Sequence, residues 1–238
     1  MSKRFIQAVF VVASVLSVPF ASAQQGDGGT VNAATLAYNV KLAEQGDANA
    51  QFNLGYFYER GNGVVADLAT SRSWYTKAAE QGDPKAQFNL SVLYGRGRGG
   101  PVDDVEALKW LIKSAGQGYV SAMNNLAIAY DEGAGTPKNL KLSFQWFQKA
   151  ADSGSVSAMV NTASMLRTGR GVERDFNKSA ALYLKAAELG SQAAQERLSY
   201  LYSIGQGVPK DPVLSDKWKT LAMTAPPSAG AIANKAGE

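Results

Sequence analysis

Asparagine side chains recur in this sequence at a fixed spacing of 36 residues, at Asn53, Asn89, Asn125 and Asn161, and Arg197 occupies the next such position. Each amide carries a donor and an acceptor, so a row of them could hold the backbone of an extended peptide. Alternatively, each amide bonds to a neighbouring repeat or to its own helix and fixes the stacking. Both interpretations remain open at this point.

Arginines and aromatic residues accompany the asparagines. Arg60 and Arg96 share the 36-residue spacing, and Glu132 follows at the same interval. Two guanidinium groups one repeat apart could hold an acidic segment of a partner, although arginines that are solvated and pair with local acids are more common. Tyr56 and Phe57 continue the same stretch. The predicted partner-binding set consists of Tyr56, Phe57, Arg60, Arg96 and the four asparagines.

Histidine and cysteine are absent from all 238 residues. This removes the usual general base, the commonest metal ligand, the thiol nucleophile and the thiolate ligands of zinc. A serine enzyme of the β-lactamase type normally needs a lysine three places after its serine, and residues 24–238 contain no Ser-x-x-Lys and no Lys-Thr-Gly. We therefore predict no catalytic residue, no metal and no cofactor.

The elements that position these side chains follow from the repeat. Each unit opens with an alanine, carries a leucine four places on and a tyrosine after four more, except for Thr162 and Leu166 in the fourth unit. Residues at this spacing lie on one side of a helix and predict an apolar stripe. The opening alanines are Ala50, Ala86, Ala122, Ala158 and Ala194.

A second helix is predicted in every unit. Paired glycines end the first helix, an aspartate or asparagine caps the second, and a further glycine stops it. A tryptophan column, interrupted by Leu182, is expected to form the core stripe of the second helix. In the first unit these positions are Gly61, Gly63, Asp67, Trp74 and Gly82.

The sequence thus predicts an all-α chain of helix-turn-helix repeats with a 36-residue period. Residues 31–46 match only the second half of a unit, as a capping helix would. The five full repeats are expected at residues 50–85, 86–121, 122–157, 158–193 and 194–223.

Both ends fall outside this pattern. Lys3 and Arg4 precede an apolar run that ends in Ala21-Ser22-Ala23, which predicts a signal peptide over residues 1–23. A flexible lead-in over 24–30 and a disordered tail over 224–238 complete the chain. Lys3 and Arg4 account for two of the net +4 charges. The remaining +2 gives no electrostatic reason to expect nucleic acid.

The units share the consensus sequence A-x-x-x-L-G-x-x-Y-x-x-G-x-G-V-x-x-D followed by W-Y-x-K-A-A-x-x-G. This consensus resembles the Sel1-like repeat family, a longer relative of the tetratricopeptide repeat. The resemblance covers about residues 38–223. The fourth unit departs from it at Thr162, Leu166 and Leu182, and the second has Gly100-Pro101 where valine usually follows the glycines. It implies a right-handed α-solenoid that binds other proteins, with the first helix of each pair on the concave side.

We therefore predict a monomeric, non-catalytic interaction scaffold or regulator of the bacterial envelope, soluble and periplasmic or secreted after cleavage near Ala23. It would bind a segment of a partner protein on the concave face. An exported β-lactamase-like or cell-wall-active enzyme is the first alternative, and a structural assembly factor for the cell wall or a surface polymer is the second. The sequence does not identify the partner.

Overall fold

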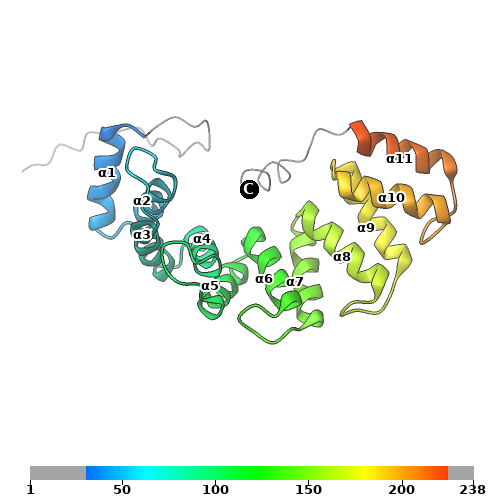
Figure 1. The fold of residues 1–238 in the computed structure, drawn as a ribbon, viewed down its shortest axis with the longest axis horizontal. Coiled ribbons are helices and arrows are strands. Elements are labelled where there is room, and N and C mark those ends of the chain that lie inside the picture. Colours follow the sequence, from blue (N-terminus) through cyan, green and yellow to red (C-terminus); the bar gives the residue numbers. More distant parts are fainter. Residues whose placement is uncertain (1–30, 225–238) are drawn as a thin grey trace, which may run out of the picture. The chain divides into compact units, whose positions relative to one another are not determined.

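The computed structural model of the chain describes residues 31–224. The predicted signal peptide, lead-in and tail lie outside this range, except that Thr224 belongs to the last helix. Every regular element between residues 31 and 224 is a helix (Figure 1). These helices are α1 (Ala33–Glu44), α2 (Ala48–Arg60), α3 (Leu68–Glu80), α4 (Pro84–Gly95), α5 (Asp104–Gly116), α6 (Val120–Glu132), α7 (Leu140–Asp152), α8 (Val156–Thr168), α9 (Phe176–Glu188), α10 (Gln192–Ile204) and α11 (Pro212–Thr224).

The helices form five consecutive hairpins, from α2/α3 to α10/α11, preceded by the single helix α1. Each helix contacts mainly its neighbours along the chain, and α2 also contacts α4, the first helix of the next unit. The all-α architecture of consecutive helical repeats predicted from the 36-residue period is therefore confirmed.

Local capping chemistry sets the helix boundaries. The Asp67 carboxylate accepts bonds from the backbone of Ala69 and Thr70 and from the Thr70 hydroxyl, at 2.9, 3.1 and 2.7 Å respectively. The Thr70 hydroxyl and backbone lower the pKa of Asp67 below its ordinary value. These bonds satisfy amide groups that have no partner in the first turn of α3.

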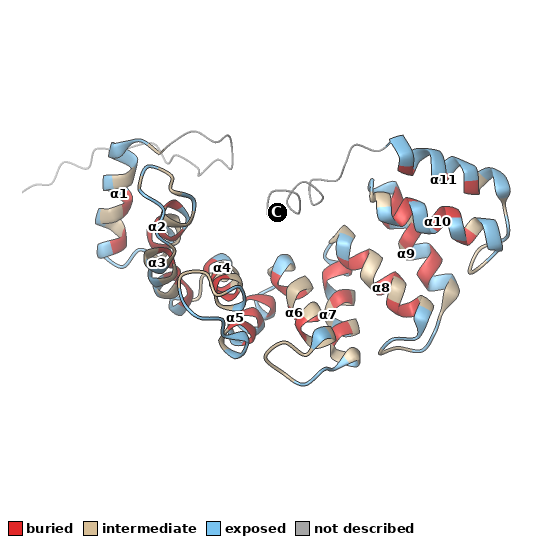
Figure 2. Cartoon of the chain, viewed as in Figure 1, coloured by how far each residue is buried: buried red, intermediate tan, exposed pale blue. Residues whose placement is uncertain are grey.

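The buried residues form three clusters, which run from α1 to α2, from α3 to α5 and from α5 to α11, so each cluster crosses from one unit or helix to the next (Figure 2). The leucines of the first helices, Leu54, Leu90 and Leu126, are fully buried. Opposite them, the second helices bury a chemically mixed column one place after the tryptophans. That column consists of Tyr75, Leu111, Phe147 and Tyr183.

The tryptophan column itself lies nearer the surface than the sequence predicts. Trp110 and Trp218 are buried as predicted, whereas Trp74 and Trp146 are only half-buried and pack against the core. The ammonium groups of Lys77 and Lys149 cover these two rings, 3.9 and 4.2 Å from the ring centroids of Trp74 and Trp146. In these units the better-buried residues are Tyr75 and Phe147, one place later, and Trp74 and Trp146 lie at the edge of the core.

The unusual Gly100 of the second unit has a local explanation in the neighbouring unit. The guanidinium of Arg72 stacks on the ring of Tyr94, 3.6 Å from its centroid, and a Cβ atom at position 100 would overlap the Arg72 Nη1 atom. The later units have Leu108, Phe144, Ala180 and Asp216 at the position of Arg72. Gly100 therefore provides the space that the guanidinium occupies.

We expect the Gly100→Val substitution to lower the free energy of unfolding by less than about 1 kcal/mol, because position 100 is exposed and the overlapping atom is the end of a flexible side chain. Residue 100 precedes Pro101, and the extended backbone favoured there suits valine, so the cost comes from Arg72. Urea denaturation followed by circular dichroism measures it. In the Arg72→Ala background the cost should disappear, and an equal cost in both backgrounds would contradict the explanation.

Candidate functional site

The predicted partner-binding residues occupy one side of the first helices. They lie three, six or ten places after the opening alanine, and these positions fall within about 60° of one another on a helix with 100° per residue. We call this side of α2, α4, α6 and α8 the first-helix face. It consists of Asn53, Tyr56, Arg60, Asn89, Arg96, Asn125 and Asn161.

Phe57 does not belong to this face. Its side chain is 8% exposed and packs in a core cluster with Ala43, Ala50 and Leu54. The reason is helical geometry, because a residue seven places after the opening alanine lies about 20° from it and points the same way. We therefore leave Phe57 out of the candidate surface, although the sequence analysis included it.

The asparagine column divides into two halves. Asn53 donates through Nδ2 to the Oδ1 atom of Asn39 in α1, at 2.9 Å, and Asn39 is itself buried. Asn89 lies close enough to the Tyr75 hydroxyl to lower its pKa. Both amides thus face the preceding repeat, as the stacking interpretation requires. The half-buried amides of Asn125 and Asn161 make no side-chain hydrogen bond within residues 31–224.

Arg60 and Arg96 are exposed, and neither forms an ion pair within the described range. The Arg60 guanidinium lies 5.8 Å from the ring centroid of Tyr56, whose side chain is 41% exposed. These three side chains therefore present two positive charges and an aromatic ring to the outside of the first two units.

The nearest acid in sequence, Glu59, is already engaged. Its Oε2 atom accepts a bond from the Tyr75 hydroxyl at 3.0 Å, and its Oε1 atom pairs with Arg98 Nη1 at 3.0 Å. Arg98 belongs to the next unit, so this Tyr75–Glu59–Arg98 chain joins the first two repeats. Glu59 and Arg60 are neighbours in α2 and therefore point to different sides of the helix.

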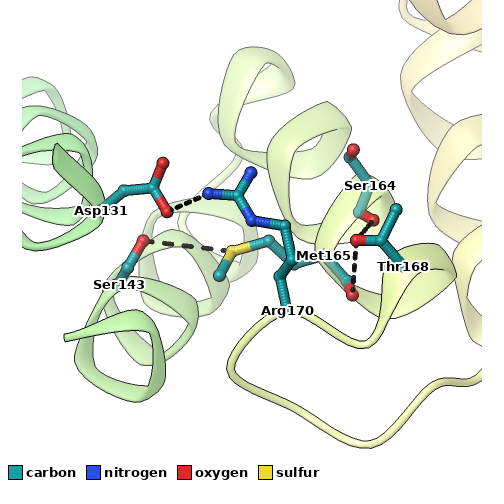
Figure 3. Close-up of polar contacts among 6 residues, drawn as sticks. All are labelled: Asp131, Ser143, Ser164, Met165, Thr168 and Arg170. Atoms are coloured by element: carbon teal, nitrogen blue, oxygen red, sulfur yellow. Dashed lines mark hydrogen bonds and ion pairs between the residues drawn. The ribbon is translucent and has the colours of Figure 1, made fainter. Parts of the chain in front are cut away.

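The same link recurs two units later. Arg170 Nη2 pairs with Asp131 Oδ1 at 2.6 Å, again joining consecutive units (Figure 3). Beside it, the Ser143 hydroxyl points at the Met165 sulfur, 4.0 Å away (Figure 3). The sequence analysis missed both ion pairs. The signal was an acid just before the end of a first helix and an arginine between the paired glycines of the next unit.

Burial raises the pKa of the Tyr75 hydroxyl well above its usual value of 10, and the negative charge of Glu59 adds to the shift. In the unfolded chain this hydroxyl ionises near pH 10, so above that pH the folded state holds more protons than the unfolded state. Stability contributed by this group is present below pH 10 and is lost as the pH rises.

We therefore expect the wild-type chain to lose up to about 1.4 kcal/mol more stability per pH unit above pH 10 than Tyr75→Phe does. Urea denaturation at pH 9, 10 and 11 measures the difference. Because all other tyrosines remain in the variant, subtraction isolates Tyr75. Parallel pH profiles for the two proteins would contradict the burial of an un-ionised hydroxyl.

The far end of the stack carries polar residues where earlier units have apolar ones. Lys219 occupies the position of Tyr75 and Phe147, and Asp216 occupies that of Leu108. With Glu196, these side chains line a shallow hollow on α10 and α11. The last unit is therefore more polar on this side than the units before it.

Other kinds of site find no support in residues 31–224. No group of three or more acidic side chains there could hold a metal ion. None of the helices described is both long enough and apolar enough to cross a membrane.

The chain is similar to known repeat proteins along most of its length. The Sel1 repeat family model matches residues 48–83, 84–119, 120–155, 156–191 and 192–218. The crystal structure of c5321, a protective antigen of uropathogenic Escherichia coli strains, is 36% identical over 79% of this chain, with a TM-score of 0.78. This chain covers only 40% of the length of that antigen.

A Sel1 repeat protein from Oxalobacter formigenes is 34% identical, with a TM-score of 0.78, over 81% of this chain and 79% of its own. A comparison with curated proteins gives no match. The family match begins each unit two residues before the opening alanine, at the start of the first helix.

Proposed function

Because this chain belongs to the Sel1 repeat family, we propose that it is a non-catalytic scaffold or regulator that binds a segment of a partner protein on its first-helix face. Sel1 repeat proteins generally mediate protein–protein interactions. We propose further that the chain acts as a monomer in the bacterial envelope, in the periplasm or outside the cell. The apolar run and small-residue cleavage pattern of residues 1–23 support this location.

One observation carries the choice of surface. On the first-helix face, the polar groups of Arg60, Arg96, Asn125 and Asn161 have no side-chain partner within residues 31–224, whereas most polar residues that recur elsewhere in the repeat serve as caps or cross-links. Donors and acceptors held on a rigid helical scaffold can bind an extended segment without first losing much conformational freedom. The structural residues of the repeat therefore leave these side chains available for a ligand.

A site-specific photocrosslinker tests this assignment in cells of the source bacterium. The reactive residue replaces Tyr56 or Asn125 on the first-helix face, and Gln145, an exposed residue of α7, serves as the matched control position. We expect one partner to crosslink from both first-helix positions and not from position 145. Equal yield from all three positions, or none from the first-helix face, would exclude it as the binding surface.

The two alternatives predict different results with the same purified protein. Turnover of the chromogenic β-lactam nitrocefin would overturn the non-catalytic assignment. Co-sedimentation with purified peptidoglycan, without a crosslinked protein, would favour the assembly factor for the cell wall.

A further inference from the structure

The arginines of the first two units are spaced for a particular kind of segment. Arg60 ends α2 and Arg96 directly follows α4 in the same register, and α2 and α4 contact each other. Helices in contact lie about 8–10 Å apart. The helices that carry Arg60 and lead to Arg96 therefore lie at about this spacing where they contact each other.

An extended polyproline II segment has a matching period. It rises about 3.1 Å per residue with three residues per turn, so side chains three places apart lie on one side at about 9 Å. In a β-strand, by contrast, residues three places apart point to opposite sides. Of these two extended conformations, polyproline II therefore matches the helix spacing with carboxylates three places apart.

One exposed aromatic side chain beside Arg60 suits the same conformation. Tyr56 is 41% exposed and lies under the Arg60 guanidinium. Proline-rich segments typically dock on aromatic surfaces of this kind.

Charge complementarity decides the ligand chemistry. Glu59 is committed to Tyr75 and Arg98, so it does not neutralise Arg60 or Arg96. One repeat further along the same column the charge reverses, because Glu132 is exposed there. The side chains of Arg60, Arg96 and Glu132 therefore carry positive, positive and negative charges in successive units.

Resting on the function proposed above, we propose that the partner segment is an acidic polyproline II stretch with carboxylates three residues apart. These carboxylates pair with Arg60 and Arg96, and a basic residue three places further on faces Glu132. The order along the segment is acid-x-x-acid-x-x-base or its reversal, because an extended peptide can lie on the face in either direction.

Fluorescence anisotropy with labelled peptides on the full chain tests the proposal. The probes are Glu-Pro-Pro-Glu-Pro-Pro-Lys, its reversal, a version with its glutamates two places apart, and Lys-Pro-Pro-Lys-Pro-Pro-Glu. We expect one of the first two to bind at least about tenfold more tightly than the charge-reversed peptide and about threefold more tightly than the two-place version. Raising the salt concentration should weaken binding.

Substitutions in the protein provide a second test of the proposal. Arg60→Ala and Arg96→Ala should each weaken the preferred peptide about three- to tenfold, as loss of a charge-assisted pair does. Arg197→Ala removes an equally exposed charge from the first helix of the last unit and should leave affinity unchanged. Equal binding of the acidic and reversed peptides, or equal effects of all three variants, would overturn the proposal.

The outcome is separable from that of the function on which the proposal rests. If a partner crosslinks at position 56 while no acidic peptide binds, the proposed acidic segment is wrong, but the assignment of the first-helix face as the binding surface stands. If neither is observed, both proposals fail.

Discussion

Replacing Gly135 with alanine is expected to lower the free energy of unfolding by more than about 3 kcal/mol, because the substitution acts in two ways. The residue has φ +69°, where an L side chain costs about 1–2 kcal/mol. A Cβ atom there would also overlap the carbonyl oxygen of Asp104, which belongs to the preceding unit. Backbone atoms cannot rotate away as a side chain can, so the two units must separate.

Gly154 provides a matched control in the same unit. It has φ +92°, and an added Cβ atom would meet nothing within 4 Å. Gly154→Ala therefore carries the left-handed strain without the clash and should cost only about 1–2 kcal/mol. Urea denaturation followed by circular dichroism gives both values. The interpretation is wrong if Gly135→Ala costs no more than Gly154→Ala.

The shape of the transition gives a second readout. Stability in a repeat protein is approximately a sum of the intrinsic stability of each unit and the contacts between neighbours. Gly135→Ala weakens the contact between the second and third units, so we expect its transition to broaden or split. Gly154→Ala should leave the transition cooperative, because that change lies outside any interface.

The repeat made the architecture predictable from the sequence. A period shared by the alanines, leucines, glycines and caps cannot arise unless successive units occupy equivalent positions. The helix ends followed from the same residues, since capping is local chemistry. The Asp67 carboxylate, for example, bonds amides only two and three places away, and such contacts need no knowledge of the tertiary fold.

Interactions between units were harder to predict. The Glu59–Arg98 and Asp131–Arg170 pairs each join residues 39 places apart. This distance is not the repeat period and depends on how one hairpin packs against the next. The pairs also occur only at alternate interfaces, so they do not form a recurring column. A search for recurring residues therefore missed them.

The composition of a column was likewise misleading for the core. Because the same residue type, tryptophan, recurs at this position, the sequence analysis assigned the column to the core. The column one place later is better buried but contains tyrosine, leucine and phenylalanine. For Phe57 the sequence did contain the answer, because its position seven places after Ala50 puts it on the buried side of α2. Helical angle was the better guide at both positions.

Trp110→Ala is expected to lower the free energy of unfolding by about 3–5 kcal/mol, as for other buried tryptophans. The side chain is 4% exposed and shares a core cluster with Tyr75, Leu90 and Leu93. Trp74→Ala should cost clearly less, because Trp74 is half-buried. A melting temperature for Trp110→Ala equal to that of the wild type would contradict the packing assignment.

Trp110→Phe separates the contribution of the ring from that of its polar atom. The Trp110 Nε1 atom is buried and has no hydrogen-bond partner within residues 31–224. Burying an unpaired donor costs about 1–3 kcal/mol, and phenylalanine lacks that donor while retaining an aromatic ring. The relief offsets part of the lost packing, so we expect Trp110→Phe to fall within about 1 kcal/mol of the wild type. A cost as large as that of Trp110→Ala would contradict the expectation that removal of the unpaired N–H offsets the lost packing.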